Sequence, residues 1–274
     1  DYLATSGTLV FDVGGPLMQT INVPIVGDLI VEGTEMATLN LGTVTDLRGA
    51  TTVTDGSGLL TINDNDSAVV AFNPVDVSQS EATSPMVFTV TLSNPVQSGV
   101  TLDLNSDFGS ATAADFTPIV GATVSFPANS NANQSVNVVI NNDVLDEDDE
   151  SFTLTLSGLT AVGNATLGAN VAAGTIIDDD PTPTISISSP SQPEGNVGTT
   201  PMNFVVSLNA VSGRDVSFTR ATADGTATVA NNDYQPLAAA TATIPAGQMS
   251  ITIPVLINGD TVFEGNENFT LNLT

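Results

Sequence analysis

The chain has 274 residues, of which 30 are acidic and only three basic, so its net charge is −27. This balance excludes nucleic acid as an expected partner, because phosphate binding needs clustered Lys and Arg, and it disfavours anionic membrane surfaces. Cys and His are absent, so disulfides, zinc or copper sites and Ser–His or Cys–His nucleophile pairs are not expected.

Alternation of apolar and polar residues predicts β-strands almost throughout, with no helical periodicity. In chain order the predicted strands include residues 21–25, 37–41, 86–93, 100–106, 136–140, 152–156, 202–209, 253–257 and 269–273. Clusters of Asn, Gly, Pro and Ser separate them. No stretch approaches the ~20 apolar residues of a membrane span, so direct membrane insertion is not expected. We expect the chain to be part of a longer one.

An acidic turn with the pattern Asp-x-x-x-Glu-x-x-Glu stands before a predicted strand in three places. The three acidic turns are residues 28–35, 143–150 and 260–267. The second begins 115 residues after the first, and the third begins 117 residues after the second. Such a period is too long for a solenoid and is typical of an independent domain.

Other phrases recur with the same period. "TINDND" (61–66) matches "TIIDDD" (175–180), and "SQSE", ending at Glu81, matches "SQPE", ending at Glu194. "ADF" at Asp115–Phe116 matches "NDY" at Asp233–Tyr234. We therefore predict three repeats. Residues 1–66 are the later part of one, residues 67–180 are complete, and residues 181–274 lack the last strand.

About seven short strands in each ~115 residues predict an immunoglobulin-like sandwich of two sheets. The chain is therefore expected to be all-β, with tandem sandwiches. The joints between repeats are short, and residues 181–184 contain proline, which stiffens a linker. We expect the sandwiches to run head to tail as a rod.

The acidic residues of the complete repeat fall in four predicted loops. If these loops share one end of the sandwich, their carboxylates converge. Two carboxylates ~5 Å apart repel by roughly 3 kcal/mol at an effective dielectric of about 20. Summed over several pairs, this rivals the roughly 5–15 kcal/mol stability of a whole domain. The three Arg lie outside these acidic segments. A cation is therefore expected, with Ca²⁺ favoured because it accepts about six to eight oxygen ligands, and Mg²⁺ second.

The combined motifs resemble the Calx-β domain. The third repeat carries the resemblance most fully, with Glu194, "DGTAT" (224–228), Asp233–Tyr234 and "GDTVFEGNENFTLNL" (259–273). The second repeat has "FGSAT" (108–112) instead of the Gly-Thr-Ala phrase and Phe116 instead of tyrosine, and the first repeat has only the later half. The resemblance implies a seven-strand sandwich with calcium ions clustered at one end.

The resemblance also implies the metal ligands. They are Glu81, Asp115, Asp143, Glu147, Glu150, Asp178, Asp179 and Asp180 in the second repeat; Asp28, Glu32, Glu35, Asp64 and Asp66 in the first; and Glu194, Asp233, Asp260, Glu264 and Glu267 in the third.

Plainer interpretations stand beside these. A single acidic turn is usually solvated, and only the three matched copies favour metal. Instead of binding metal, the run Asp178–Asp180 could form a polar linker between domains. Asp115 could be a turn residue beside an aromatic ring of the core. Asp146, Asp148 and Asp149 lack acidic counterparts in both other turns and are interpreted as solvated charge.

Nothing in the sequence favours catalysis. A paired-carboxylate glycosidase needs aromatic platforms, whereas the chain has no Trp and two Tyr. The leading hypothesis is a calcium-binding structural module in the stalk of an extracellular or cell-surface adhesin or filament of bacterial type, since weak calcium modules work in the roughly millimolar calcium outside the cell. Its partners would be calcium ions and neighbouring repeats, with the adhesion ligand unidentified. The alternatives are an intracellular calcium-sensing domain of a transporter and an adhesin tip.

Overall fold

The computed structural model describes residues 1–46, 49 and 51–274. These residues form seventeen strands and no helix, so the prediction of an all-β chain is confirmed. Within this part of the chain, no helix is long and apolar enough to cross a membrane. Predicted alternation becomes alternating burial, as in β5 (Met86–Leu92), where every second side chain is buried.

Residues 1–66 contain one sheet of two antiparallel strands, β1 (Glu35–Asn40) and β2 (Ser57–Ile62). The strand predicted at residues 21–25 is wrong, because this segment forms only a single bridge between Tyr2 and Ile25. Within the described residues of this region, no second sheet faces β1 and β2. The alternating apolar side chains of residues 21–25 therefore stay half-buried or exposed instead of closing a core.

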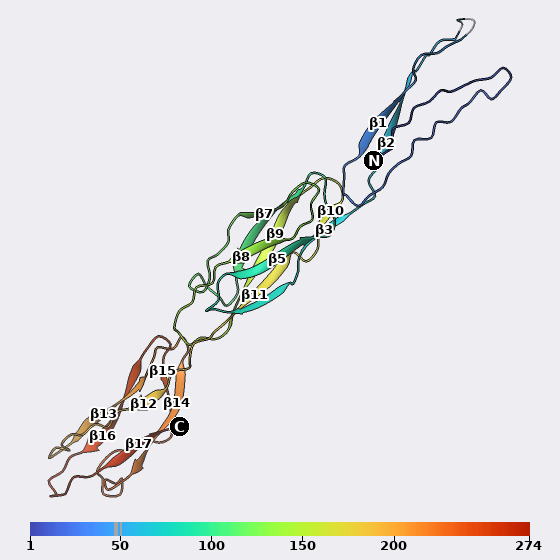
Figure 1. Ribbon diagram of the computed structural model, residues 1–274. Helices are drawn as coiled ribbons and strands as arrows, with labels where there is room; N and C mark the ends of the chain where they lie inside the picture. The colour runs from blue at the N-terminus through green and yellow to red at the C-terminus, as the bar shows by residue number, and fades with distance from the viewer. Residues whose placement is uncertain (47–48, 50) are drawn as a thin grey trace. The chain divides into compact units, whose positions relative to one another are not determined.

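Residues 67–180 form a sandwich of two sheets (Figure 1). The first has the order β10–β3–β5–β8 and the second β4–β11–β9–β6–β7. The remaining bounds are β3 (Ala68–Phe72), β4 (Asp76–Ser80), β6 (Val100–Phe108), β7 (Ala122–Phe126), β8 (Gln134–Val138), β9 (Glu150–Thr160), β10 (Ala165–Leu167) and β11 (Val171–Ile177). Nine strands replace the predicted seven, because the chain changes sheets between β3 and β4 and because the short β10 pairs in parallel with β3.

Residues 181–274 form two three-stranded sheets, β12–β13–β16 and β15–β14–β17. Their bounds are β12 (Ile185–Ile187), β13 (Thr199–Leu208), β14 (Val216–Asp224), β15 (Ala240–Ile244), β16 (Ser250–Asn258) and β17 (Phe269–Leu273). The second and third repeats are therefore two-sheet sandwiches, as expected.

Matching aromatic groups join the two sheets in each of these sandwiches. Phe152 stacks on Phe116 with ring centroids 4.4 Å apart and meets Phe88 edge-on at 6.0 Å. In the third repeat, Phe269 stacks on Tyr234 at 4.3 Å and meets Phe204 edge-on at 5.9 Å. The aromatic residue after Asp115 and Asp233 is thus a core residue, and it holds each aspartate at the end of its sandwich.

The chain forms two compact units. The first contains residues 1–77, 85–139 and 151–174, and the second contains residues 78–84, 140–150 and 175–274. The second acidic turn and Glu81 therefore belong to the same unit as the third repeat. The repeat boundaries at residues 67 and 181, and the rod, stay predictions.

Candidate metal centre

In each acidic turn, the carboxylate of the first aspartate accepts a hydrogen bond from the backbone N–H two residues later. Asp28 Oδ1 accepts a hydrogen bond from the Ile30 N–H at 2.7 Å. Asp143 and Asp260 do the same for the N–H groups of Leu145 (2.8 Å) and Val262 (2.7 Å). This is the two-residue bond with which Asp stabilises turns. The three turns therefore share one local structure, which presents the two glutamates that follow.

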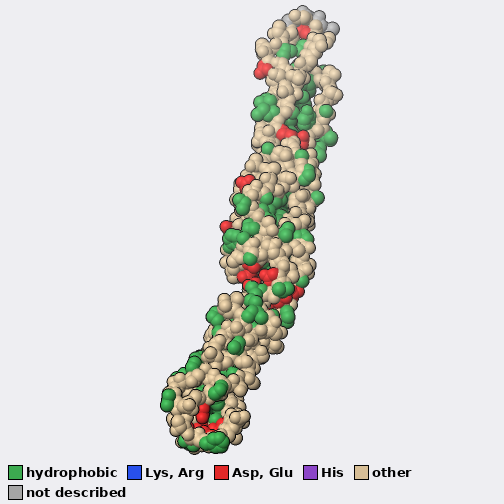
Figure 2. Space-filling model, turned by 90° about the vertical axis from the view of Figure 1, so that its left-hand side faces the viewer, with side chains coloured by type: hydrophobic (Ala, Val, Ile, Leu, Met, Phe, Trp, Pro, Cys, Tyr) green, Lys and Arg blue, Asp and Glu red, His purple; other side chains and the backbone are tan. Residues whose placement is uncertain are grey.

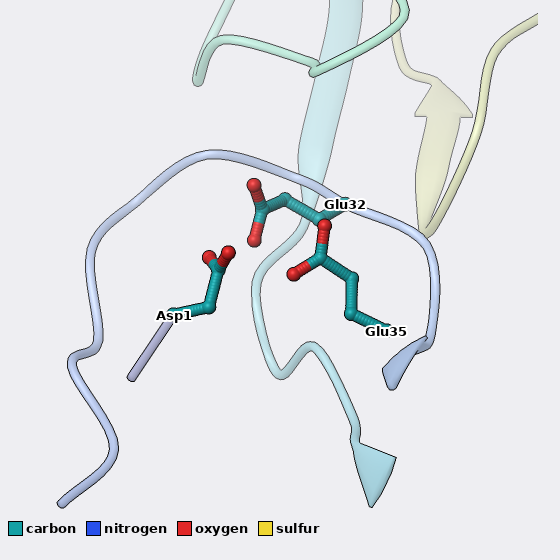
Figure 3. Close-up of side chains that lie close together, drawn as sticks. All are labelled: Asp1, Glu32 and Glu35. Atoms are coloured by element: carbon teal, nitrogen blue, oxygen red, sulfur yellow. The ribbon is translucent and has the colours of Figure 1, made fainter. Parts of the chain in front are cut away.

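In the first unit, the carboxylates of Asp1, Glu32 and Glu35 come together, with one oxygen from each within 4.8 Å of the others (Figure 3). The Glu32 N–H donates to Asp64 Oδ2 at 3.0 Å, which places the loop after β2 beside the acidic turn. The Asp66 N–H in turn donates to Asp64 Oδ1 at 3.2 Å.

Sequence reasoning missed Asp1. The signal was present, because Asp1–Tyr2 repeats the pairs Asp115–Phe116 and Asp233–Tyr234. Asp1 also precedes Glu32 by 31 residues, as Asp233 precedes Glu264. Asp1 is therefore the first repeat's counterpart of these aspartates.

The grouping of Asp1, Glu32 and Glu35 has an electrostatic consequence. The pKa of Glu32 is raised above its ordinary value by burial first, and then by the negative charges of Glu35, Asp28 and Asp64. Such a shift means that ionisation of one carboxylate opposes that of its neighbours. A bound cation would offset the repulsion between these carboxylates and favour their ionised forms.

Asp115 lies in the first unit, where its Oδ2 accepts hydrogen bonds from the Thr112 N–H at 2.6 Å and from Thr112 Oγ1 at 2.8 Å. Glu147 and Glu150 lie in the second unit, and Glu150 is the first residue of β9. By sequence position these three residues match Asp1, Glu32 and Glu35.

In the second unit, Glu81, Asp143 and Asp180 each place one carboxylate oxygen within 4.8 Å of the other two. Glu81 is only 8% exposed. Glu81 Oε1 and Asp180 Oδ2 are buried and have no hydrogen-bond partner among the described residues. Buried polar atoms are normally partnered, and a buried charge needs a counter-charge. A group of carboxylates with buried, unpartnered oxygens therefore fits a bound cation.

The environment raises the pKa of Glu81 to about 7. Burial is the main cause, followed by a hydrogen bond that the protonated Glu81 carboxyl shares with Asp180, and then by the charges of Asp143, Asp180 and Asp178. Without a cation, Glu81 therefore keeps its proton up to near neutral pH. A divalent ion would have to displace that proton.

The other two aspartates of the run after β11, Asp178 and Asp179, each accept a hydrogen bond from the protein. The Asp180 N–H donates to Asp178 Oδ1 at 3.4 Å, which repeats the Asp64–Asp66 turn. Asp179 Oδ2 accepts a hydrogen bond from Ser80 Oγ at 2.8 Å. Asp179 is also exposed, whereas Asp178 and Asp180 are half-buried.

In the third repeat, Asp233, Glu264 and Glu267 place one oxygen each within 4.8 Å of one another. Asp233 Oδ2 also accepts a hydrogen bond from the Thr228 N–H at 2.6 Å, much as Asp115 does from Thr112. These three residues line an open groove together with Glu194.

The pKa values of Glu264 and Glu267 are both raised, first by partial loss of hydration and then by neighbouring carboxylates. For Glu264 these are Glu267, Asp260, Asp233 and Glu194 in that order, and for Glu267 they begin with Asp233. Figure 2 shows several acidic side chains gathered into patches on the face in view. The arrangement suits a hard cation with oxygen ligands better than a soft metal.

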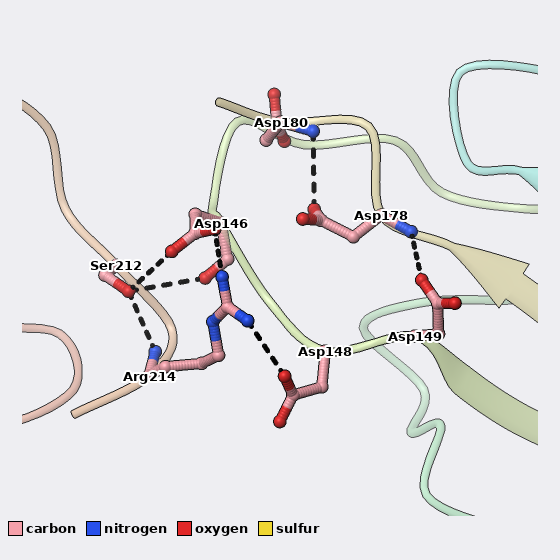
Figure 4. A network of polar contacts seen from close by, with 7 residues as sticks. All are labelled: Asp146, Asp148, Asp149, Asp178, Asp180, Ser212 and Arg214. Carbon is pink, nitrogen blue, oxygen red and sulfur yellow. Dashed lines mark hydrogen bonds and ion pairs between the residues drawn. The ribbon is translucent and has the colours of Figure 1, made fainter. Parts of the chain in front are cut away.

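The interpretation of Asp146, Asp148 and Asp149 as solvated charge is wrong for Asp146, which is 4% exposed and paired with Arg214 (Figure 4). Asp148 is 83% exposed but also pairs with Arg214, at 2.9 Å. Asp149 Oδ1 accepts a hydrogen bond from the Asp178 N–H at 3.2 Å. Although Arg214 lies outside the acidic segments of the sequence, the fold brings it to the second acidic turn. Arg48 lies outside the described residues.

Two solved structures are similar to parts of this chain. The crystal structure of the apo-form Calx CBD1 domain is 22% identical over 41% of this chain and 98% of that one, with a TM-score of 0.38. The structure of CBD12 from CALX1.2 is 18% identical over 75% of this chain and 79% of that one, with a TM-score of 0.39. No curated protein matches the sequence significantly.

A family model gives the decisive comparison. The model of the Calx-beta domain matches residues 1–66, 63–180 and 184–274, which together cover nearly all of the sequence. The predicted resemblance is therefore confirmed, and the chain belongs to the Calx-beta domain family.

Proposed function

We propose that the chain is a calcium-binding structural module of a cell-surface or extracellular stalk, in which calcium rigidifies the repeats and the joints between them. The observation that carries the calcium part is the pair of buried oxygens, Glu81 Oε1 and Asp180 Oδ2, that have no hydrogen-bond partner among the described residues. The residues proposed as ligands are those implied by the resemblance, together with Asp1. Glu81, Asp143 and Asp180 form the best-supported group.

The stalk part rests on different support. Three Calx-beta matches follow one another with almost no linker between them. The acidic, Lys-free composition suits a chain surrounded by roughly millimolar external calcium, in which weak extracellular modules work. We propose a structural rather than a catalytic role. Calcium affinity near millimolar favours the stalk, and micromolar affinity would favour an intracellular sensor instead.

Calcium is expected to stabilise the chain strongly and magnesium weakly. A ligand at a hundred times its dissociation constant adds ~2.7 kcal/mol to the free energy of unfolding. Magnesium requires a small octahedral site and gives up its water ligands reluctantly. Loops with many carboxylates therefore bind magnesium less well than calcium. Thermal melts in chelator, in magnesium and in calcium measure the difference. Coincident melting curves in all three would overturn the calcium proposal.

The tightest calcium binding is expected in the second repeat. Residues 67–180 contain every proposed element, namely Glu81, Asp115, the acidic turn and the run Asp178–Asp180. The double variant Glu147→Gln/Asp178→Asn should remove the tightest phase of a calorimetric calcium titration. The matched changes Glu32→Gln and Glu264→Gln should leave that phase intact. Equal contributions from all three turns would contradict the assignment.

A further inference from the structure

Two acidic turns are fastened to a short loop of the repeat that follows. We name these docking loops: residues 95–98 follow β5, and residues 211–214 follow β13. Each begins three residues after its strand ends, at Leu92 or Leu208. The two loops therefore occupy equivalent places in the second and third repeats. The first contact lies within the first unit and the second within the second unit.

A parallel bridge and one backbone hydrogen bond recur in both places. The fourth residue of the first acidic turn, Val31, forms an isolated parallel bridge with Val96, and the Gln97 N–H donates to the Val31 carbonyl at 2.9 Å. The fourth residue of the second turn, Asp146, forms the same bridge with Ser212. The Gly213 N–H donates to the Asp146 carbonyl at 3.0 Å. Both contacts therefore use one register.

The side chains differ completely. Val31 and Val96 are both wholly buried, so the first contact is apolar. At the second contact, Ser212 Oγ donates to Asp146 Oδ2 at 3.0 Å, and the Arg214 guanidinium pairs with Asp146 Oδ1 (Figure 4). A buried carboxylate is stable only when paired and hydrogen-bonded, so Asp146 requires this loop. Each turn is thus matched to its own docking loop.

The docking loops also touch glutamates proposed as metal ligands. Gln97 Nε2 donates to Glu32 Oε1 at 3.3 Å and to Glu35 Oε1 at 3.1 Å. At the second contact, a Cβ atom added to Gly213 would lie 2.6 Å from Glu147 Cγ, so the Glu147 side chain packs directly on that glycine. Docking therefore fixes the position of the glutamate that follows the docked residue.

The third acidic turn has Phe263 at the equivalent position. Its side chain is wholly exposed, in contrast to Val31 and Asp146. Among the described residues this turn has no bridge to a docking loop, so Phe263 is the undocked counterpart of Val31 and Asp146.

We propose that the fourth residue of each acidic turn is a docking residue that fixes the following repeat and positions the metal-binding glutamates. The side chain of the docking residue determines which docking loop can bind it. The contact is apolar at the first joint and ion-paired at the second. The coupling to calcium rests on the proposed function. The coupling is reciprocal. If calcium strengthens docking by some factor, docking raises calcium affinity by the same factor.

The second joint allows a transplant test in the whole chain. Arg214→Ala should weaken the tightest phase of a calorimetric calcium titration about 10- to 100-fold, as expected for a residue that orients metal ligands. The triple variant Asp146→Val/Ser212→Val/Arg214→Ser installs the residue types of Val31, Val96 and Ser98 at the second joint, keeps Gly213, and should return the affinity toward the wild-type value. Arg220→Ala, in β14 of the same repeat, is the matched control and should bind as the wild type does. An unchanged Arg214→Ala affinity, or a triple variant as weak as the single one, would refute the positioning role.

A metal-free measurement separates docking from calcium binding. In chelator, melts of Asp146→Val, Arg214→Ala and the double variant form a double-mutant cycle. Direct docking predicts strong non-additivity, because removing either partner alone leaves an unmatched group in the joint. Additive effects would refute docking. A wild-type chain that binds no calcium but gives a non-additive cycle would refute the proposed function and retain the docking residue.

Discussion

Replacing Glu81 with glutamine is expected to make the metal-free protein more stable above pH 7 and to remove most of its response to calcium. Glu81 is nearly buried beside Asp143 and Asp180, so its ionised form is strongly disfavoured without a cation. Glutamine has the same shape and carries no charge. It therefore removes the repulsion and also one proposed ligand.

The pH dependence follows from the raised pKa of Glu81, which is about 7 in the folded protein against an ordinary value near 4.5. Below pH 4.5 the group is protonated in both states, and its stabilising contribution is fully present. Between pH 4.5 and 7 the unfolded chain releases the proton while the folded chain keeps it, so stability falls. The total loss from this group is roughly 3 kcal/mol.

Calcium should reverse that trend. A metal binds the ionised carboxylate, so calcium affinity rises with pH as Glu81 loses its proton. In chelator, the free energy of unfolding of the wild type should decline from pH 5 to pH 8, and in calcium the decline should shrink or invert. Denaturant unfolding at several pH values measures both curves.

The matched control is Glu194→Gln, at the equivalent position of the third repeat, where the side chain is only half-buried. It should change the metal-free pH profile much less than Glu81→Gln does. If Glu81→Gln keeps the full calcium response, Glu81 is not a ligand. If its metal-free profile matches that of the wild type, burial does not govern the Glu81 carboxylate.

The sequence predicted the fold well where periodicity decides it. Residues 152–156 were predicted as a strand, and its alternating residues Phe152, Leu154 and Leu156 are all wholly buried. The same reasoning failed at residues 21–25, because alternation creates a strand only where a neighbouring segment pairs with its backbone, and this segment has a single bridge, to Tyr2. Local pattern does not report whether such a pairing partner is present.

The acidic sites show a similar division. Repetition was enough to predict the three acidic turns, and their identical spacing produces the same local hydrogen bond in each. It did not reveal that Asp146 is buried, because its partner Arg214 lies 68 residues away. Charge patterning assigns a carboxylate to solvent unless a cation is near in sequence, and here the cation arrives through tertiary structure.

Phe152→Ala is expected to cost about 3–5 kcal/mol of stability in the first unit, the range for removing a buried aromatic ring. The Phe152 ring stacks on Phe116, meets Phe88 edge-on and lies against Gly174, where an added Cβ would be 2.4 Å from Phe152 Cζ. Gly174→Ala alone should therefore overpack the core and cost about 1–3 kcal/mol.

The decisive variant combines Gly174→Ala with Phe152→Leu, since the smaller side chain makes room for the new methyl group. Denaturant unfolding in chelator should show that the double variant is more stable than the sum of the two single changes predicts. Phe269→Ala, in the matching aromatic group of the third repeat, should cost less because Phe269 is only half-buried. Additive effects would show that Gly174 and the Phe152 ring do not share the same space. Equal costs for Phe152→Ala and Phe269→Ala would show that burial of the ring does not set its contribution.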